Sequence, residues 1–410
     1  MIVILSLDGV CYQDVELAKY PNLCQLSEKG VYTKRLHTVF PSVTWSVHTS
    51  VITGVAPGQH EIWGNEVFSR KAQTPLCYYD ASKVTISDVR KPTLFSKAAE
   101  LGKTSAAICW PLTQGSPHIK YNIPECYTQA EINDFSTPAL VAELLTAGLE
   151  FSRYAAWSSS IEHAVLQDDL TCKITEFLIE RKSVDVLFSH FLTHDSFQHC
   201  YGTQTPESEW SLLYMDGLVG RIINSLKLAG IFEYSHIIVF SDHGHESVSK
   251  FFDFKSFLKQ LGIAADVFHT ASNGGAFFLY HKKADIPEEL LSRMRIALEE
   301  QEAIEFVCTK ENPEKFGFQP QFNKDTFPDI IVGLNHGWVL DAPSSAINIG
   351  SIPVKNPRAN KSTHGYLPSS HPRMDSFMIR AGRSFPRGVR EETGQICDLY
   401  DMVNQVLVNM

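Results

Sequence analysis

Seven side chains that suit divalent metal ions stand in five short segments spread over the sequence. They are Asp8, Thr44, Asp195, His199, Asp242, His243 and His364. Carboxylates and imidazoles are common zinc ligands in proteins, and a pair of metal ions can clamp both sides of a displacement at phosphorus. The set provides enough ligands for two ions, so we expect a two-metal centre. Zinc is the first candidate, and manganese or iron would also suit these donors.

The local spacing of these residues fits metal binding. Asp195 and His199 are four residues apart, which places them on one face if a helix begins there. An isolated pair of this kind is more often a helix cap beside a surface histidine. Asp242 and His243 are adjacent, and Gly244 permits a tight turn, so they can serve one metal or two neighbouring metals. The alternative for this second pair is a capping aspartate beside a buried histidine.

Thr44 precedes an apolar helical run that extends to Ile52. Its hydroxyl is therefore expected near a helix N-terminus, where backbone N–H groups and the helix dipole favour an anion. A hydroxyl must be activated to act as a nucleophile, and metal coordination provides that activation without a neighbouring base. An ordinary helix cap is the simpler interpretation of Thr44 when the other segments are ignored.

Apolar runs that are typical of buried strands lead into three of the five segments. IVIL precedes Asp8, HIIVF precedes Asp242, and the looser run DVLFSHFL precedes Asp195. Continuous apolar runs indicate parallel strands that are covered by helices on both faces. Because open α/β sheets bind ligands beyond the carboxyl ends of such strands, the three segments are predicted to meet at one crevice.

The rest of the sequence predicts an α/β fold with a mainly parallel central sheet flanked by helices. The 410 residues, 44% of them hydrophobic, can bury a large core, and strand-like and helical stretches alternate along most of the chain. We expect a catalytic core from residues 1–245 and 360–410. Residues 246–359 are expected to form an inserted α+β subdomain, and residues 114–164 a lid or cap over the site.

Composition limits the partners and the compartment. The net charge of −10 disfavours a nucleic-acid or anionic membrane surface. No stretch is long enough to span a bilayer, and the apolar start MIVILSL lacks a basic region, so it is predicted to be a first strand and not a secretion signal. Nine cysteines without regular spacing favour reduced thiols in the cytoplasm. The sequence does not indicate an oligomeric state.

The order of the motifs resembles a known family. Matching pieces run from LSLDGV through YPNLCQLSEKGV, FPSVTWSVHTSVITGVAPGQHEIWGN, CWP, DSFQH, SDHGH and PDIIVGLNHGW to THGY. In this order they are similar to the type I phosphodiesterase/nucleotide pyrophosphatase family of the alkaline phosphatase superfamily. The chain departs from the family at three points: His245 stands where Met is usual, Trp45 where Phe is commoner, and DSFQH has no Gly before its His.

The resemblance implies an alkaline-phosphatase-like fold and a role for each site residue. Two zinc ions are implied, one on Asp8, Thr44, Asp242 and His243, and the other on Asp195, His199 and His364. Thr44 matches the nucleophile of the family. Asn65 matches the asparagine whose side-chain amide holds a non-bridging phosphoryl oxygen.

We therefore expect a metal-dependent hydrolase that cleaves phosphodiester or nucleotide pyrophosphate bonds through a phospho-threonine intermediate. No Arg or Lys occurs from Pro41 to Ala56 to pair with a phosphomonoester dianion. A phosphomonoesterase is nevertheless an alternative, because an Arg from a distant segment could enter the site. A second alternative is a phosphonate hydrolase of the phosphonoacetate type, which would need a cation such as Lys120. A non-catalytic metal-binding protein is the third.

Other residues could contribute to such a site, although a structural role is the commoner one for each. Histidines that could orient metal ligands are His48, His60, His194 and His371. Aromatic residues that could stack on a nucleobase are Trp45, Trp63, Tyr154 and Trp157.

Overall fold

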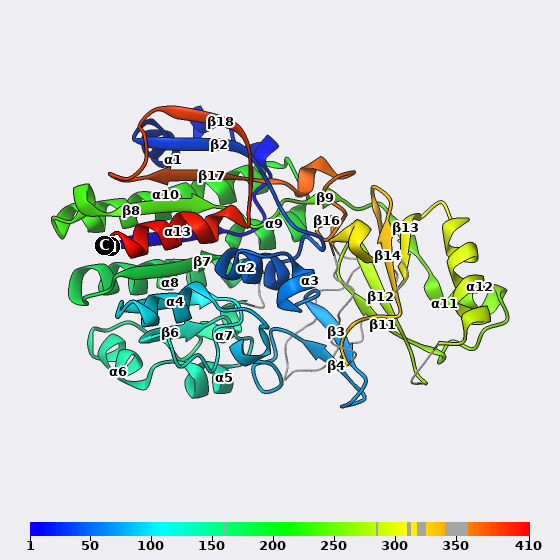
Figure 1. Ribbon diagram of the computed structural model, residues 1–410. Coiled ribbons are helices and arrows are strands. Elements are labelled where there is room, and N and C mark those ends of the chain that lie inside the picture. The colour runs from blue at the N-terminus through cyan, green and yellow to red at the C-terminus, as the bar shows by residue number, and fades with distance from the viewer. Residues whose placement is uncertain (159–160, 284–285, 310–312, 318–324, 341–359) are drawn as a thin grey trace.

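An eight-stranded sheet forms the centre of the computed structural model (Figure 1), in the order β18-β2-β17-β8-β1-β7-β5-β6. Its strands in chain order are β1 (Ile2–Leu7), β2 (Gly30–His37), β5 (Ser105–Trp110), β6 (Tyr121–Pro124), β7 (Val186–Phe191), β8 (His236–Phe240), β17 (Ser376–Ala381) and β18 (Val389–Gln395). The structure describes residues 1–158, 161–283, 286–309, 313–317, 325–340 and 360–410.

The expected parallel core is confirmed at the three strands that carry the candidate ligands. The central strand β1 pairs in parallel with β7 on one side and with β8 on the other. Every residue of these three strands is buried. The neighbouring strand β17 is the exception, because it runs antiparallel to both β8 and β2. The sheet is therefore mainly parallel, with one reversed strand.

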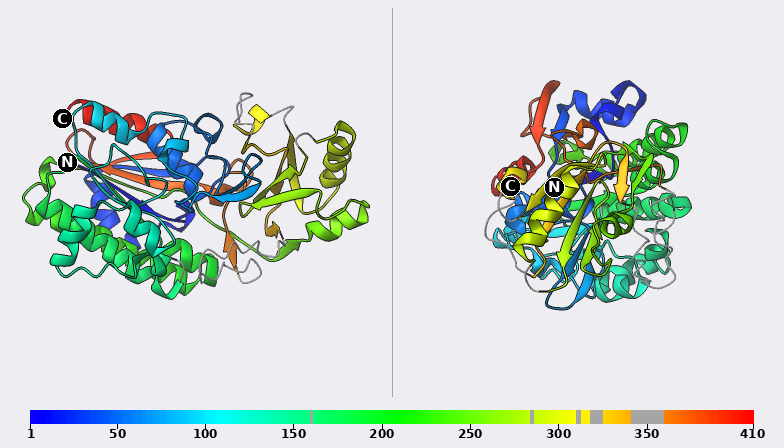
Figure 2. Two further views of the ribbon diagram at one scale, coloured as in Figure 1. Left: turned by 90° about the horizontal axis from the view of Figure 1, so that it is seen from below. Right: turned by 90° about the vertical axis from the view of Figure 1, so that its right-hand side faces the viewer.

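Helices cover both faces of the sheet, and alternate residues of β1 point to opposite layers. Val3 and Leu5 pack in a core with α1 (Pro21–Glu28), α8 (Ile161–Arg181) and α10 (Pro206–Leu228). Ile2 and Ile4 pack in a second core with α2 (Thr44–Thr53), α4 (Leu94–Glu100) and α13 (Asp398–Val408). Figure 2 shows the two helical layers on either side of the strands. This arrangement explains why these strands are mainly apolar.

A second, antiparallel sheet lies beyond one end of the central sheet, on the right in Figure 1. It has the order β11-β12-β14-β13, from β11 (Phe268–Ser272), β12 (Ala276–His281), β13 (Ile304–Thr309) and β14 (Ile330–Leu334), and its core includes residues of α11 (Phe254–Gln260) and α12 (Glu288–Glu299). The subdomain boundaries at 246 and 359 stay a prediction. Residues 284–285, 310–312, 318–324 and 341–359 of that range lie outside the described residues.

Residues 114–164, expected to form a lid or cap, contribute the edge strand β6 and the helices α5 (Gln129–Phe135), α6 (Pro138–Thr146) and α7 (Tyr154–Ser158). Residues 159–160 of this segment lie outside the described part, and the lid stays a prediction. The remaining elements are α3 (Pro57–His60), β3 (Glu66–Ser69), β4 (Thr74–Cys77), α9 (Thr193–Tyr201), β9 (Glu246–Ser247), β10 (Lys250–Phe252), β15 (Trp338–Leu340) and β16 (Ser362–Thr363). Among the described helices, none has both the length and the apolar character that a membrane span requires.

Candidate metal centre

The parallel pairing of β8, β1 and β7 brings the candidate ligands to one edge of the sheet. Asp8 follows the end of β1 and Asp242 lies two residues beyond β8, while Asp195 lies in α9 directly after β7. The turn after β1 is tied to both neighbours, because Asp8 N donates to Phe191 O (2.9 Å) and Gly9 N donates to Asp242 Oδ1 (3.2 Å). The three carboxylates therefore meet at the carboxyl ends of the strands, as the sequence predicts.

Three of the predicted ligands surround one ring nitrogen of the fourth, His243. His243 Nε2 lies 3.3 Å from Thr44 Oγ1, 3.5 Å from Asp8 Oδ1 and 3.3 Å from Asp242 Oδ2. All four side chains are buried. Asp8 Oδ1 and Asp242 Oδ2 accept no hydrogen bond from any described residue. Buried carboxylate oxygens of this kind need a cation, so the donor set fits a divalent metal ion.

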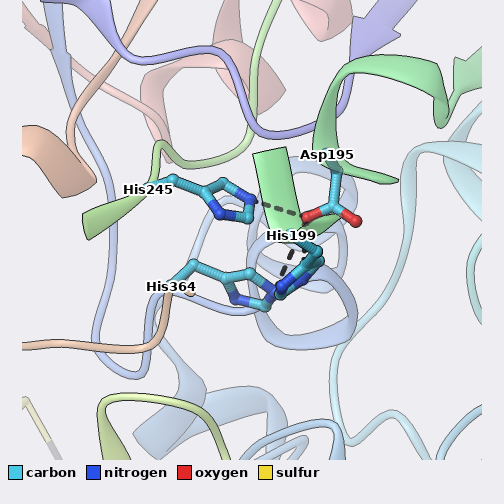
Figure 3. Close-up of side chains that lie close together, drawn as sticks. All are labelled: Asp195, His199, His245 and His364. Carbon is cyan, nitrogen blue, oxygen red and sulfur yellow. Dashed lines mark hydrogen bonds and ion pairs between the residues drawn. The ribbon is translucent and has the colours of Figure 1, made fainter. Parts of the chain in front are cut away.

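The other three predicted ligands form a second cluster around Asp195, together with a residue that was not predicted as a ligand. Asp195 Oδ1 lies 3.3 Å from His199 Nε2 and 3.7 Å from His364 Nε2. It also lies 2.8 Å from Nε2 of His245 (Figure 3). The predicted pairing of Asp195 and His199 on one helical face is present in α9.

Hydrogen bonds on the outer side fix the orientation of the imidazoles. His199 Nδ1 donates to Ser362 O (2.9 Å), His364 Nδ1 to Ser42 O (3.2 Å) and His243 Nδ1 to the neighbouring carbonyl of Gly244 (3.3 Å). A carbonyl can only accept, so Nδ1 carries the proton in each ring. Each Nε2 is then the nitrogen that can bind a metal, which is the usual arrangement of ligand histidines.

The electrostatics of the centre also suit a cation. Burial, with the nearby carboxylates of Asp242 and Asp195, raises the pKa of Asp8 well above its ordinary value. Burial lowers the pKa of His245 to about 3, and burial with the neighbouring His243 lowers the pKa of His364 well below its usual range. Both imidazoles are therefore neutral at pH 7, which is the form that binds metals.

Thr44 is the first residue of α2, as predicted. Its N-cap, Val43, has no side chain that can accept a hydrogen bond from the first turn, so no internal cap occupies that end of the helix. One turn later, His48 Nδ1 donates to Thr44 O (2.8 Å), and the same nitrogen lies 3.6 Å from Asp242 Oδ2. His48 therefore contacts a candidate metal ligand and the backbone of the candidate nucleophile.

Asn65 lies beside the same helix end. Its Oδ1 accepts a hydrogen bond from Trp45 N (3.1 Å), so the orientation of the amide is fixed and its NH₂ group is directed away from that N–H. Its backbone N–H donates to Asn273 Oδ1 (2.7 Å), from the turn that joins β11 and β12. The second sheet thus holds the candidate phosphoryl-binding residue.

The other candidate histidines have structural contacts outside the two clusters. His60 Nε2 is bonded to Ser50 Oγ (3.0 Å), and His194 Nδ1 to Ser211 Oγ (2.8 Å). His371 lies between two glutamates, 3.0 Å from Glu305 Oε2.

Only Trp45 among the candidate aromatic residues adjoins the site. Trp63 donates to Thr326 Oγ1 (3.2 Å), Tyr154 is bonded to Thr171 Oγ1 (2.6 Å), and Trp157 packs on the main core.

Two further buried residues that the sequence interpretation missed support Asp8. His190 in β7 lies with Nε2 at 3.2 Å from Asp8 Oδ2 and Nδ1 at 3.1 Å from Glu125 Oε2. Burial disfavours the imidazolium, but the bonds to Asp8 and Glu125 outweigh it and raise the pKa of His190 well above its ordinary value. The sequence contained one signal for this contact, a histidine inside a mainly apolar strand, since a buried imidazole must have polar partners.

Comparison with known proteins agrees with this geometry. A family model described as type I phosphodiesterase/nucleotide pyrophosphatase matches residues 2–367. Curated proteins named bis(5'-adenosyl)-triphosphatase ENPP4 are 22% identical in both orangutan (Pongo abelii) and human, over 99% of this chain and 77–78% of theirs. A solved structure of murine ectonucleotide pyrophosphatase/phosphodiesterase 5 shares the fold, with a TM-score of 0.74 at 18% identity over 99% of this chain and 95% of that one.

A second structure of the murine protein is an inactive threonine-to-alanine variant in complex with AMP, with a TM-score of 0.73 at 18% identity over 99% of this chain and 94% of that one. The central sheet, its helical layers and the order of the motifs all agree with the matched family. The chain is a hydrolase that belongs to the type I phosphodiesterase/nucleotide pyrophosphatase family.

Proposed function

We propose that this protein hydrolyses phosphodiester or nucleotide pyrophosphate bonds through a covalent phosphoester on Thr44. The observation that carries the proposal is the position of Thr44 Oγ1, 3.3 Å from His243 Nε2 and at the N-terminus of α2. In this place a hydroxyl adjoins a set of metal ligands and the end of a helix that favours anions.

Two zinc ions would be held by the His243 cluster and the Asp195 cluster, and when bound they would lower the pKa of the Thr44 hydroxyl and stabilise charge on the phosphoryl oxygens. The residues of the chain supply the rest. Thr44 forms the bond to phosphorus as the leaving alcohol or phosphate departs, and water then cleaves the Thr44 ester. The first turn of α2 and the amide of Asn65 donate to the non-bridging oxygens.

The charges near Thr44 favour a diester. A phosphomonoester dianion needs a strong cationic partner, and residues 41–56 contain no Arg or Lys. The phosphonate alternative would need a cation, for which Lys120 was the candidate, but Lys120 precedes β6, and its backbone N–H donates to Ser105 O (3.1 Å) at the start of β5. Since β5 and β6 are parallel, Lys120 lies at the edge of the sheet opposite the metal centre.

Aromatic residues beside Asn65 support a nucleotide substrate. Trp45 meets Tyr79 edge-on with ring centroids 5.6 Å apart, and Tyr79 lies 4.9 Å from Tyr127. Tyr79 and Tyr127 are partly exposed, so this wall can offer ring surface to a base. The AMP complex of the related murine protein and the name of the ENPP4 relatives also point to adenine nucleotides as the first substrates to try.

The test compares hydrolysis of bis-p-nitrophenyl phosphate and p-nitrophenyl phosphate by the zinc-loaded protein. Thr44→Ala should abolish turnover with two zinc ions retained. Thr53→Ala is the matched control, because Thr53 lies in the same helix and bonds only to Thr49 O (2.6 Å) among the described hydrogen bonds. Preference for the monoester would instead indicate a phosphomonoesterase, and a two-zinc protein inactive on both would make phosphonoacetate the next substrate.

The compartment is a separate proposal. All nine cysteines lie in described parts of the chain, and all are free thiols. Free thiols persist in a reducing environment, which supports the cytoplasm as the working compartment. Labelling of the protein with a membrane-impermeant thiol reagent on intact cells would contradict this assignment.

A further inference from the structure

We propose that His245 is a direct ligand of the metal ion at the Asp195 cluster, which gives that ion one carboxylate and three imidazoles. The inference rests on the two-metal centre of the proposed function. His245 occupies the position where the family usually has Met, so the family's own ligand set does not include it. In this chain, the histidine at position 245 and its closeness to Asp195 add a fourth ligand to that set.

The four side chains form one compact group. Asp195, His199, His245 and His364 each offer a ligand atom, and these atoms all lie within 4.8 Å of one another. Figure 3 shows the rings of His245 and His364 approaching Asp195 Oδ1 from one side. The ring of His199 approaches the same oxygen from α9. The distances to Asp195 Oδ1 are 2.8 Å for His245, 3.3 Å for His199 and 3.7 Å for His364. His245 is thus the imidazole nearest to the shared carboxylate.

The proton positions around His245 identify its inward nitrogen as a lone-pair donor. Ser362 Oγ donates its only proton to Gln198 O (2.6 Å), because a carbonyl can only accept. Ser362 Oγ must therefore accept from His245 Nδ1, 3.1 Å away. The proton of the neutral ring is then on Nδ1, and Nε2 carries a lone pair. His199 Nδ1 is oriented by the carbonyl of the same Ser362.

His245 Nε2 and Asp195 Oδ1 lie 2.8 Å apart, close enough for one cation to bind both atoms. Two acceptors repel at that distance, and a shared metal ion removes the repulsion. The backbone of His245 is also held in place, since Arg373 Nε donates to His245 O (2.9 Å) and Gly244 N donates to Met374 O (3.0 Å). The backbone contacts and the bond from Nδ1 to Ser362 Oγ therefore hold the ring in place beside the cluster.

Four protein donors instead of three have a chemical consequence. Imidazole suits zinc and iron better than manganese, whereas carboxylates suit manganese well. A site with three imidazoles should therefore prefer zinc or iron.

Proton NMR of the cobalt-loaded protein tests the assignment directly. A histidine bound to Co²⁺ through Nε2 shows a strongly shifted, exchangeable Nδ1–H resonance, and these protons are held by the carbonyl and hydroxyl acceptors described above. We expect four such resonances in the two-cobalt protein, from His243, His199, His364 and His245. Three resonances in the wild-type protein would overturn the proposal, and this result requires no variant that must fold.

His245→Gln separates a ligand from a residue that only orients Asp195. The Gln amide can still donate a hydrogen bond to the carboxylate, but it is a poor zinc ligand. We expect three resonances and a loss of more than about 100-fold in zinc affinity at one site, measured by chelator competition, because loss of an orienting partner costs only about 10–100-fold. A loss of about 100-fold or less would show an orienting role at most and overturn the proposal.

His236→Gln is the matched control, since His236 begins β8 at the end away from the centre and bonds to Ser384 Oγ (2.7 Å). It should keep four resonances and wild-type affinity. These readouts need no turnover, so they also separate the two proposals. Two bound ions with three resonances would refute His245 as a ligand and leave the phosphodiesterase proposal intact. Four resonances without Thr44-dependent hydrolysis would support His245 as a ligand and refute the phosphodiesterase proposal.

Discussion

Replacing Asn273 by Ala should lower catalysis through Asn65, although Asn273 is in the second sheet. Asn273 Oδ1 accepts hydrogen bonds from Asn65 N (2.7 Å) and Glu66 N (3.1 Å), and its Nδ2 donates to Glu66 O (3.0 Å). The side chain is only 2% exposed. Its truncation leaves three partly buried backbone groups without these partners, and the loop with Asn65 loses its anchor.

The size of the effect follows from these bonds. A hydrogen bond contributes a net ~0.5–1.5 kcal/mol, so the loss of three should destabilise the protein by about 1.5–4.5 kcal/mol. Misplacement of a reacting group by about 1 Å can cost about 10²-fold in rate, and removal of one oxyanion donor costs about 10²–10³-fold. We therefore expect Asn273→Ala to lower kcat on the diester by about 10–100-fold while two zinc ions stay bound.

A double-mutant cycle on kcat provides the assay. If Asn273 acts through Asn65, the double variant with Asn65→Ala should be no slower than Asn65→Ala alone. Asn335→Ala is the matched control, because Asn335 Nδ2 also bonds to backbone carbonyls, of Glu302 (2.8 Å) and Ile304 (3.1 Å). Independent losses that multiply in the double variant, or an unchanged kcat for Asn273→Ala, would refute the coupling.

Three other predictions concern the metals and the pH dependence. His364→Ala should lower zinc content from two ions toward one per chain by atomic absorption, and an unchanged content would contradict the ligand assignment. Zinc at about 100 times its dissociation constant should raise the free energy of unfolding by about 2.7 kcal/mol, because the ion binds the carboxylates of the folded protein only. Thermal unfolding with and without a chelator measures this effect, and equal melting temperatures would exclude it. Burial lowers the pKa of His371, but Glu246 and Glu305 outweigh it and raise the pKa to about 9. The stabilisation by His371 is thus complete below its unfolded pKa of about 6.5 and is lost as pH rises through about 9. In urea unfolding, His371→Gln should therefore destabilise the protein by about 1–2 kcal/mol at pH 6 and by little at pH 10. A difference that does not change with pH would contradict this.

The sequence was sufficient where local pattern determines local structure. The apolar run before Asp8 and the run before Asp242 form β1 and β8, and the four-residue spacing of Asp195 and His199 is realised in α9. Parallel pairing then brings their ends together, because buried parallel strands in one sheet share an edge for their carboxyl ends. The position of the candidate nucleophile was equally local, since Thr44 begins α2.

The sequence was insufficient where the partner is far along the chain. The reversed strand β17 lies between β2 and β8, although more than a hundred residues separate it from either in sequence, and its apolar residues do not indicate direction. His245 was recognised only as a departure from the family. Its contact with Asp195, fifty residues away, depends on how the turn after β8 packs against α9. The pairing of His190 with Asp8 is non-local in the same way.

The turn between β11 and β12 connects the two halves of the chemistry. Asn273 in this turn holds the backbone of Asn65, and Gly275 N donates to His364 O (2.8 Å). Gly274 has a φ of +71°, and a Cβ at this position would overlap the His364 carbonyl oxygen, so only glycine lets the two backbones approach so closely. One turn therefore positions both Asn65, whose amide is proposed to bind the phosphoryl oxygens, and His364, a candidate ligand of the Asp195 cluster. The second sheet is thus part of the catalytic framework, because a core without it would contain every predicted ligand but would lack the contacts that place two of the site residues.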